Sequence, residues 1–155
     1  RGLLNPGDDH RGLRDIVEVR ITLDNALAEP VTHAWHNRHD PELNTLVDNI
    51  EHLASQGKLF TDQDRRFHTR LLEPLDNHLY LHLTEAFWAI HTLTVPLLDA
   101  PKLEDLTSTA KAHRAMLKAA HAGDTPAYHQ AITDHYAPLL AVLTHPVENS
   151  SVRAG

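Results

Sequence analysis

Two long helical patterns meet at the dipeptide Gly123-Asp124, and each carries one histidine on its apolar face. His113 lies ten residues before Gly123, and His135 lies eleven residues after Asp124. If the flanking segments form an antiparallel hairpin of helices, the two rings lie at the same height, roughly 16 Å from the turn at about 1.5 Å per residue. The spacing therefore predicts a helical hairpin that points two imidazoles into the protein.

A third helical pattern brings Asp64 and His68 onto one face, because residues four apart lie one above the other on a helix. Phe67 shares that face, so both polar groups are expected to point inward. A buried carboxylate beside a buried imidazole is costly without compensating partners. His113 and His135 are the candidate partners, and one Asp with three His inside a helical bundle is typical of a divalent-metal site.

The chain contains fourteen histidines, so metal-like spacings also arise by accident. Asp48 and His52 share the Asp-His spacing but lie opposite an apolar stripe, which favours a solvated surface pair. His78 and His82 flank the stripe of their helix and are weaker candidates for a metal or ligand contact. Each of the four preferred residues, taken alone, could also be a hydrogen-bonded core residue.

Helical periodicity runs through most of the 155 residues, and no stretch alternates as a strand would. The expected helices cover residues 13 to 39 with a break at Pro30, then 40–57, 61–74, 77–98, 101–123 and 124–144. The segment 77–98 is apolar nearly all round, which is typical of a central helix. The sequence therefore predicts an all-α domain with six or seven helices.

The composition of the chain limits the kinds of partner that it can bind. The formal net charge of -7 argues against a basic nucleic-acid-binding face, and the absence of cysteine excludes disulfides and thiolate metal sites. No apolar run approaches the roughly 18 residues of a membrane span, so we expect a cytoplasmic protein without a membrane partner. Because the sequence starts at Arg1, we interpret it as a fragment of a longer protein.

The predicted ligand set also indicates what the site would bind. One carboxylate and three neutral imidazoles leave a divalent ion with a net charge of about +1 and two of six positions open, which suits a small carboxylate. Zn²⁺, Ni²⁺, Mn²⁺ and Fe²⁺ all accept these ligands. Arg20, in the middle of the first helix, is the best second cation for such an anion. Its alternative role is an ion pair with Glu18, Asp24 or another helix.

These residues together resemble a known family, the FCD domain, which is the C-terminal effector domain of the FadR subfamily of GntR transcription regulators. The most specific element is the order Asp64, His68, His113 and His135, with 22 residues between the last two. The resemblance extends over about residues 11–145. It also includes the segments Arg14-Asp15-Ile16-Val17-Glu18-Val19-Arg20 and His113-x-x-Met116-Leu117-x-Ala119, with Asn77 between them.

The resemblance implies an antiparallel bundle over residues 11–146, with a metal held in its interior by the four residues above. It implies that Arg20 and Asn77 bind a small organic acid effector, and that the regulator is a homodimer. Residues 1–10 would be the linker from an N-terminal winged helix-turn-helix domain, which alone would contact DNA, and 147–155 a tail. The sequence departs from the family pattern at Asp24, Asp76 and Glu29-Pro30.

Two other functions remain open from the residues. An open Asp/His₃ metal site could activate water in a metalloenzyme, with Glu85 as the candidate general base. Alternatively, the chain is a helical interaction module in which the histidines have no joint role. The effector class also stays open, since hydroxy acids, sugar acids, dicarboxylates and tricarboxylates are all compatible with the predicted site.

Overall fold

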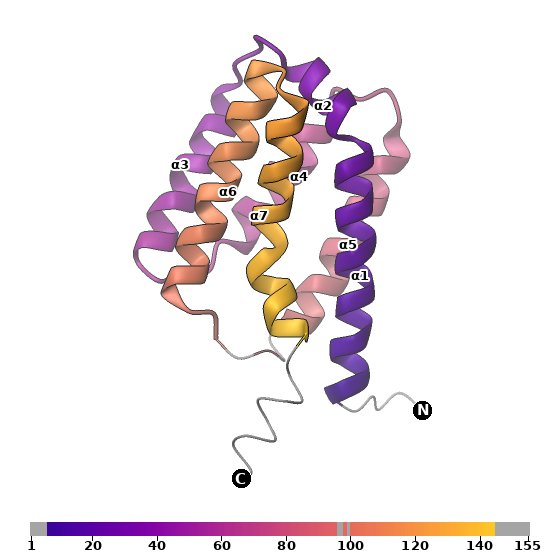
Figure 1. Cartoon of the computed structure of the whole chain (residues 1–155), viewed down its shortest axis with the longest axis vertical. Coiled ribbons are helices and arrows are strands. Elements are labelled where there is room, and N and C mark those ends of the chain that lie inside the picture. Colours follow the sequence, from indigo (N-terminus) through magenta and orange to yellow (C-terminus); the bar gives the residue numbers. More distant parts are fainter. Residues whose placement is uncertain (1–5, 96–97, 99, 145–155) are drawn as a thin grey trace.

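All of the secondary structure that the computed structural model describes is helical, which confirms the predicted fold class. The structure describes residues 6–95, 98 and 100–144, and side chains from residue 11 onward. Within this part there are seven helices and no strand (Figure 1). They are α1 (Pro6–Ala26), α2 (Ala28–Trp35), α3 (Pro41–Ser55), α4 (Thr61–Leu72), α5 (His78–Thr94), α6 (Leu103–Ala122) and α7 (Thr125–Thr144).

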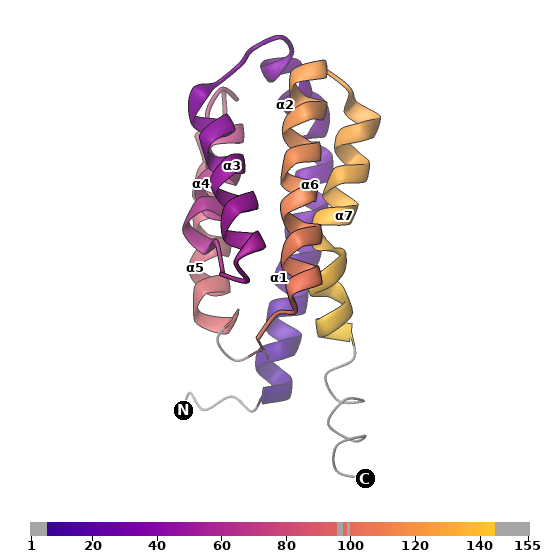
Figure 2. The same cartoon turned by 90° about the vertical axis from the view of Figure 1, so that its left-hand side faces the viewer.

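Six of these helices form a closed ring in which neighbours are antiparallel. The order around the ring is α1, α7, α6, α3, α4 and α5, and α5 packs back against α1. The short helix α2 covers one end and packs on α6 and α7 (Figure 2). Side chains from all round the ring fill its interior, so a polar residue that points inward from one helix meets residues of several others.

Local sequence signals set several helix ends. Asp40 caps α3, since its Oδ2 accepts a hydrogen bond of 3.0 Å from the Leu43 amide, and Pro41 occupies the first turn. The turn between α6 and α7 depends on Gly123, whose φ of 67° is left-handed. A Cβ at Gly123 would lie 2.9 Å from Cγ of His36, so space and conformation both require glycine there.

The first helix departs from its predicted bounds. α1 begins at Pro6, so residues 6–10, which were predicted to belong to a linker, are helical. The break between α1 and α2 falls at Leu27, three residues before Pro30. Proline fits the first turn of α2 because amides there need no partner within the helix. The predicted tail 147–155 lies outside the described residues.

The prediction that 77–98 is a central helix is wrong. In α5 only Thr84 and Trp88 are buried, and four large apolar side chains, Leu79, Leu83, Ile90 and Leu93, are exposed. α5 packs against α1 and α4 on one side only, so it is a peripheral helix. An all-round apolar pattern does not distinguish a helix enclosed by its own domain from one that presents an apolar face outward.

No helix in the described part of the chain combines the length and apolar character needed to cross a bilayer.

Candidate metal centre

Helix α4 supplies two of the predicted ligands from its inward face. Asp64 and His68 lie one turn apart, and Phe67 and Leu71 on adjoining positions are fully buried. The indole Nε1 of Trp35 on α2 donates a hydrogen bond of 2.9 Å to the Leu71 carbonyl. This buried contact fixes the height of α4 relative to α2 and therefore helps to position its two polar residues.

The hairpin of α6 and α7 supplies the other two ligands, as its turn predicted. His113 is completely buried and His135 is 7% exposed. Nδ1 of His113 donates to the Thr109 carbonyl at 2.8 Å, one turn earlier in α6, and Phe67 packs edge-on against the ring at a centroid distance of 5.1 Å. These two contacts orient the imidazole so that Nε2 points into the interior of the helix bundle.

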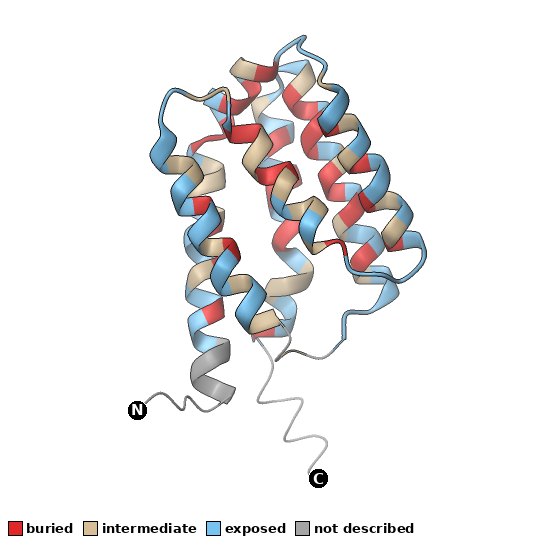
Figure 3. Ribbon diagram, turned by 180° about the vertical axis from the view of Figure 1, so that it is seen from behind, coloured by how far each residue is buried: buried red, intermediate tan, exposed pale blue. Residues whose placement is uncertain are grey.

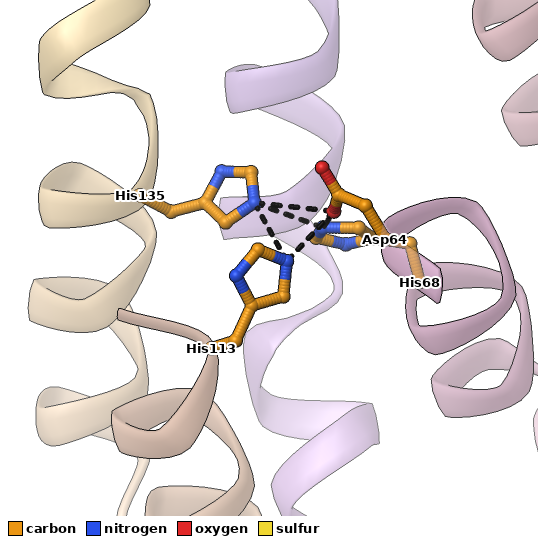
Figure 4. A group of neighbouring side chains, drawn as sticks. All are labelled: Asp64, His68, His113 and His135. Atoms are coloured by element: carbon orange, nitrogen blue, oxygen red, sulfur yellow. Dashed lines mark hydrogen bonds and ion pairs between the residues drawn. The ribbon is translucent and has the colours of Figure 1, made fainter. Parts of the chain in front are cut away.

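The four side chains converge on one point (Figure 4). Oδ1 of Asp64 lies 2.7 Å from Nε2 of His113, 3.0 Å from Nε2 of His68 and 3.6 Å from Nε2 of His135. Nε2 of His135 lies 3.0 Å from that of His68 and 3.2 Å from that of His113. All four candidate ligand atoms fall within 4.8 Å of one another.

The donor chemistry of the cluster fits a cation. The Thr109 carbonyl only accepts hydrogen bonds, so Nδ1 of His113 carries the proton and Nε2 of the neutral ring presents a lone pair. That lone pair faces the carboxylate oxygen of Asp64, another acceptor, at 2.7 Å. A proton or a metal ion between them resolves the conflict. Ligands about 2.1 Å from one ion are roughly 3 Å apart when adjacent, which matches the observed separations.

The pKa values favour the protonation states that metal binding requires. Burial would raise the pKa of Asp64, but when a proton lies between Asp64 and His113 the charge of that imidazolium and hydrogen bonds from the imidazoles outweigh burial, so the pKa is well below its usual value. Burial and the neighbouring charge of His113 lower the pKa of His135 to about 3. Asp64 is therefore ionised and His135 neutral at pH 7, as metal ligands must be.

Arg20 lies beside this cluster, and the ion pairs that were its alternative role are not found in the described part of the chain. Its side chain is 5% exposed, and its guanidinium carbon lies 4.6 Å from the ring centre of Trp88 and 5.2 Å from that of Tyr136. Asp24, one turn away, instead accepts a hydrogen bond of 2.7 Å from the Tyr136 hydroxyl. Arg20 is thus a buried cation without a carboxylate partner among the described residues.

One polar contact to Arg20 comes from α5. Its Nη1 lies 3.5 Å from Nδ1 of His91, a long hydrogen bond in which arginine donates. Burial and the charge of Arg20 lower the pKa of His91 to about 4, so His91 is a neutral acceptor at pH 7. This contact is weak compensation for a buried guanidinium.

Arg20 and one member of the cluster, His68, line the same small pocket. Its cavity volume is about 10 Å³, which is room for about one water molecule. The ring centres of Trp88 and His68 are 6.1 Å apart, so Trp88 is close to both the arginine and the histidine. The residues that line the pocket are Arg20, Leu23, Asp24, His68, Thr84, Phe87, Trp88 and Tyr136.

Other predicted residues lie elsewhere. Asn77 is exposed at the start of α5, where its Oδ1 accepts a hydrogen bond of 3.0 Å from the Leu79 amide, so its role in effector binding stays a prediction. His78 and His82 are exposed, as is Glu85, the candidate base of an enzyme. Asp48 forms a surface ion pair with Arg114 at 2.6 Å, which agrees with its interpretation as a solvated residue.

Three residues near the site were not singled out from the sequence. Thr109 orients His113 through its carbonyl, and its position four residues earlier on the same helical face was a usable signal. Trp88 and Tyr136 enclose the Arg20 guanidinium from α5 and α7. No local spacing relates either aromatic residue to Arg20, so only the packing of the ring reveals them.

Fold and site together define a helical bundle protein with a candidate metal centre of one Asp and three His. The chain belongs to the FCD domain family, whose sequence model matches residues 15–138, and this confirms the family inferred from the motif order. The chain is also 44% identical over 114 residues to a Micromonospora viridifaciens protein titled "Putative transcriptional regulatory protein NedR". That similarity covers 74% of this chain and 82% of that protein. No solved structure matches the chain.

Proposed function

We propose that this chain is the ligand-sensing domain of a GntR-type transcription regulator of the FadR subfamily. In this proposal Asp64, His68, His113 and His135 hold a divalent metal, and a small organic acid binds between that metal and Arg20. Membership of the FCD family and similarity to a protein titled as a transcriptional regulator support the regulatory role. DNA binding is assigned to a winged helix-turn-helix domain outside these residues.

The observation that carries the proposal is that the Asp/His cluster and the buried guanidinium of Arg20 lie close together. The cluster brings one carboxylate and three imidazoles within hydrogen-bonding distance, with acceptor atoms that a proton or a metal ion would join, and Arg20 is a buried cation that forms no ion pair among the described residues. A divalent ion would supply a positive centre with open coordination positions. Together with Arg20 it would outweigh the carboxylates of Asp64 and Asp24 and leave the pocket with a small net positive charge, whose attraction for an anion increases at low local dielectric.

Arg20 suits a carboxylate because its planar guanidinium donates two parallel hydrogen bonds. Its stacking between Trp88 and Tyr136 restricts the side chain before any ligand binds, which reduces the entropy lost on binding. The pocket has room for about one water molecule, so even a compact acid must displace lining side chains, and a long acyl chain would have to displace more of them. Asp24 and the Tyr136 hydroxyl offer additional polar groups for a hydroxy or keto substituent.

The position of the pocket supports allosteric control. The candidate metal ligands come from α4, α6 and α7, while α1, α5 and α7 provide the remaining pocket residues. An effector that pulls Arg20 toward the metal would therefore act on five of the six helices that form the ring. Such an effector controls DNA binding only if its affinity differs between the two arrangements of the dimer.

Thermal-shift screening of small carboxylates on the metal-loaded chain tests the proposal. An effector should raise the unfolding midpoint through linkage, and a chelator should abolish the increase. Arg20→Ala should weaken effector binding at least tenfold and therefore reduce the shift in the unfolding midpoint. Arg66→Ala, on the surface, should leave the effector affinity unchanged. Chemical turnover of the acid by the metal-loaded chain would instead support the metalloenzyme alternative and would contradict the sensor role.

A further inference from the structure

Asp24 and Tyr136 line the pocket as a hydrogen-bonded pair, with the Tyr136 hydroxyl 2.7 Å from Oδ2 of Asp24. A carboxylate has no proton to give, so the phenol donates and its single proton is used within the pair. The atoms that the pair still offers to a ligand are lone pairs on the carboxylate and on the phenol oxygen. The pair is therefore a set of hydrogen-bond acceptors without a free donor.

Arg20 offers the opposite chemistry in the same pocket. Its guanidinium carries only donors, and the long contact of 3.5 Å to His91 is its one hydrogen bond to the described residues. Arg20 and Asp24 lie one turn apart on α1, yet they form no ion pair within the described part of the chain. The pocket therefore contains a donor group and an acceptor group that do not satisfy each other.

We propose that the Asp24–Tyr136 pair selects the effector, and that the effector is a monocarboxylic acid with a hydroxyl group. This inference rests on the proposed function, in which the acid binds between the metal and Arg20. The carboxylate of such an acid supplies acceptors for Arg20, and its hydroxyl supplies the proton that the Asp24–Tyr136 pair lacks. A keto group supplies only further acceptors, so a keto acid leaves buried acceptors of the pair without a donor.

The charges of the pocket act against acids with a second carboxylate. A divalent ion and Arg20 would contribute three positive charges, and Asp64 and Asp24 contribute two negative ones, so the metal-loaded pocket would have a net charge of about +1. One carboxylate neutralises that charge, whereas a second adds a negative charge that Asp24 repels at low local dielectric. Asp24 therefore excludes dicarboxylates and tricarboxylates, which the metal and Arg20 alone would accept.

Helix α5 is the wall of the pocket that makes room for the acid. The cavity holds about one water molecule, so lining side chains must move when an acid enters. Thr84, Phe87 and Trp88 line it from α5, which packs against α1 and α4 and is exposed along most of its length (Figure 3). Asp24 and Tyr136 belong to α1 and α7, which pack against each other. An outward displacement of α5 therefore enlarges the pocket and keeps the selecting pair intact.

Isothermal titration of the metal-loaded chain with matched acids tests the selectivity. Lactate, pyruvate, propionate and malonate share a three-carbon chain, and gluconate and glucarate share a six-carbon chain. In each set the hydroxy monocarboxylate, lactate or gluconate, should bind at least about tenfold more tightly than the others. If pyruvate or malonate bound as tightly as lactate, or glucarate as tightly as gluconate, the inference would be wrong and the proposed function would stand. If none of the six acids bound, both would be wrong.

Asp24→Asn tests the role of the pair directly, and the wild-type order of affinities does not depend on this variant folding. Asparagine keeps an oxygen that accepts from Tyr136, but it carries no charge and its amide nitrogen donates. The variant should bind malonate at least about tenfold more tightly than the wild type does, and the preference for lactate should disappear. Glu18→Gln, which removes one charge from an exposed position on the same helix, is the matched control and should keep the wild-type order. An unchanged order in folded Asp24→Asn would overturn the assignment.

Discussion

Helix α4 carries charged residues on two faces that differ in how their charges are compensated. On the outward face, Arg66 donates to Glu42 at 2.8 Å and to Glu73 at 3.2 Å. Arg70 donates to Asp40 at 2.9 Å and to Glu73 at 3.0 Å and also pairs with Glu42 at 3.7 Å, so each arginine there has at least two carboxylate partners. On the inward face, Asp64 and His68 meet two further imidazoles, and acceptor atoms face one another.

The difference separates a structural network from a binding site. The outward network is complete within the protein, lies partly in water and therefore contributes modestly to stability. The inward cluster is buried and requires a cation to satisfy its lone pairs, and that cation need not come from the chain. This contrast predicts large effects when the inward face is perturbed and small ones when the outward face is perturbed.

Metal removal should have the largest effect. A divalent ion bound at about a thousand times its dissociation constant stabilises the folded state by about 4 kcal/mol. For a chain of this size that corresponds to a change in Tm of roughly 8–16 °C. Differential scanning calorimetry with and without chelator measures it, and restored metal should recover the original Tm. If the Tm of a metal-loaded sample did not change on chelation, protons alone would satisfy the hydrogen bonds among the four side chains and the metal proposal would fail.

Replacement of a single candidate ligand should come next. His113→Ala removes a fully buried metal ligand and should weaken metal binding by more than about 100-fold. Residues that only orient a ligand typically cost 10–100-fold when replaced. Competition with a chromophoric chelator gives the affinity. His52→Ala, an exposed histidine on α3, is the control and should leave the affinity unchanged.

The sequence predicted the inward-facing cluster because the patterns that indicate it are local or depend on a single turn. The spacing of Asp64 and His68, together with a hairpin fixed by Gly123, brings three histidines and one aspartate to one level without knowledge of the whole fold. The partners of Arg20 were not accessible in this way. Trp88 and Tyr136 belong to helices that meet α1 only when the ring closes.

The sequence also misplaced α5 within the bundle. Its apolar residues are distributed all round, and one side of that pattern is exposed in the folded chain. The period of a helical pattern specifies which residues share a face but not what covers that face. A second copy of the chain is as consistent with the pattern as a central position in the fold, and sequence alone does not separate the two.

A smaller, pH-dependent effect is expected at His91, beside Arg20. Its pKa is 6.5 when the side chain is fully solvated and about 4 in the folded protein, so between these values the unfolded state binds more protons. The free energy of unfolding should therefore fall as the pH drops from 6.5 to 4, by on the order of 2 kcal/mol from this group. Urea denaturation of the metal-free chain at pH 7.5, 5.5 and 4.5 measures the loss.

His91→Gln isolates that contribution because glutamine does not titrate. The variant should lose less stability than the wild type between pH 7.5 and 4.5, whatever its stability at pH 7.5. Equal losses in both proteins would show that the Arg20 environment is already open to solvent. That outcome would also weaken the argument that Arg20 is a buried cation awaiting an anion.

The outward face of α4 should give the smallest effect. The side chains of Arg66 and Glu42 are 41% and 42% exposed, so water screens their attraction. Arg66→Ala should lower the free energy of unfolding by less than about 1 kcal/mol, and a double-mutant cycle with Glu42→Ala should give a coupling that shrinks in high salt. Its metal affinity should equal that of the wild type. If Arg66→Ala instead weakened metal binding as strongly as His113→Ala, the two faces of α4 would act as one network, because the outward ion pairs would then be holding the inward ligands in place.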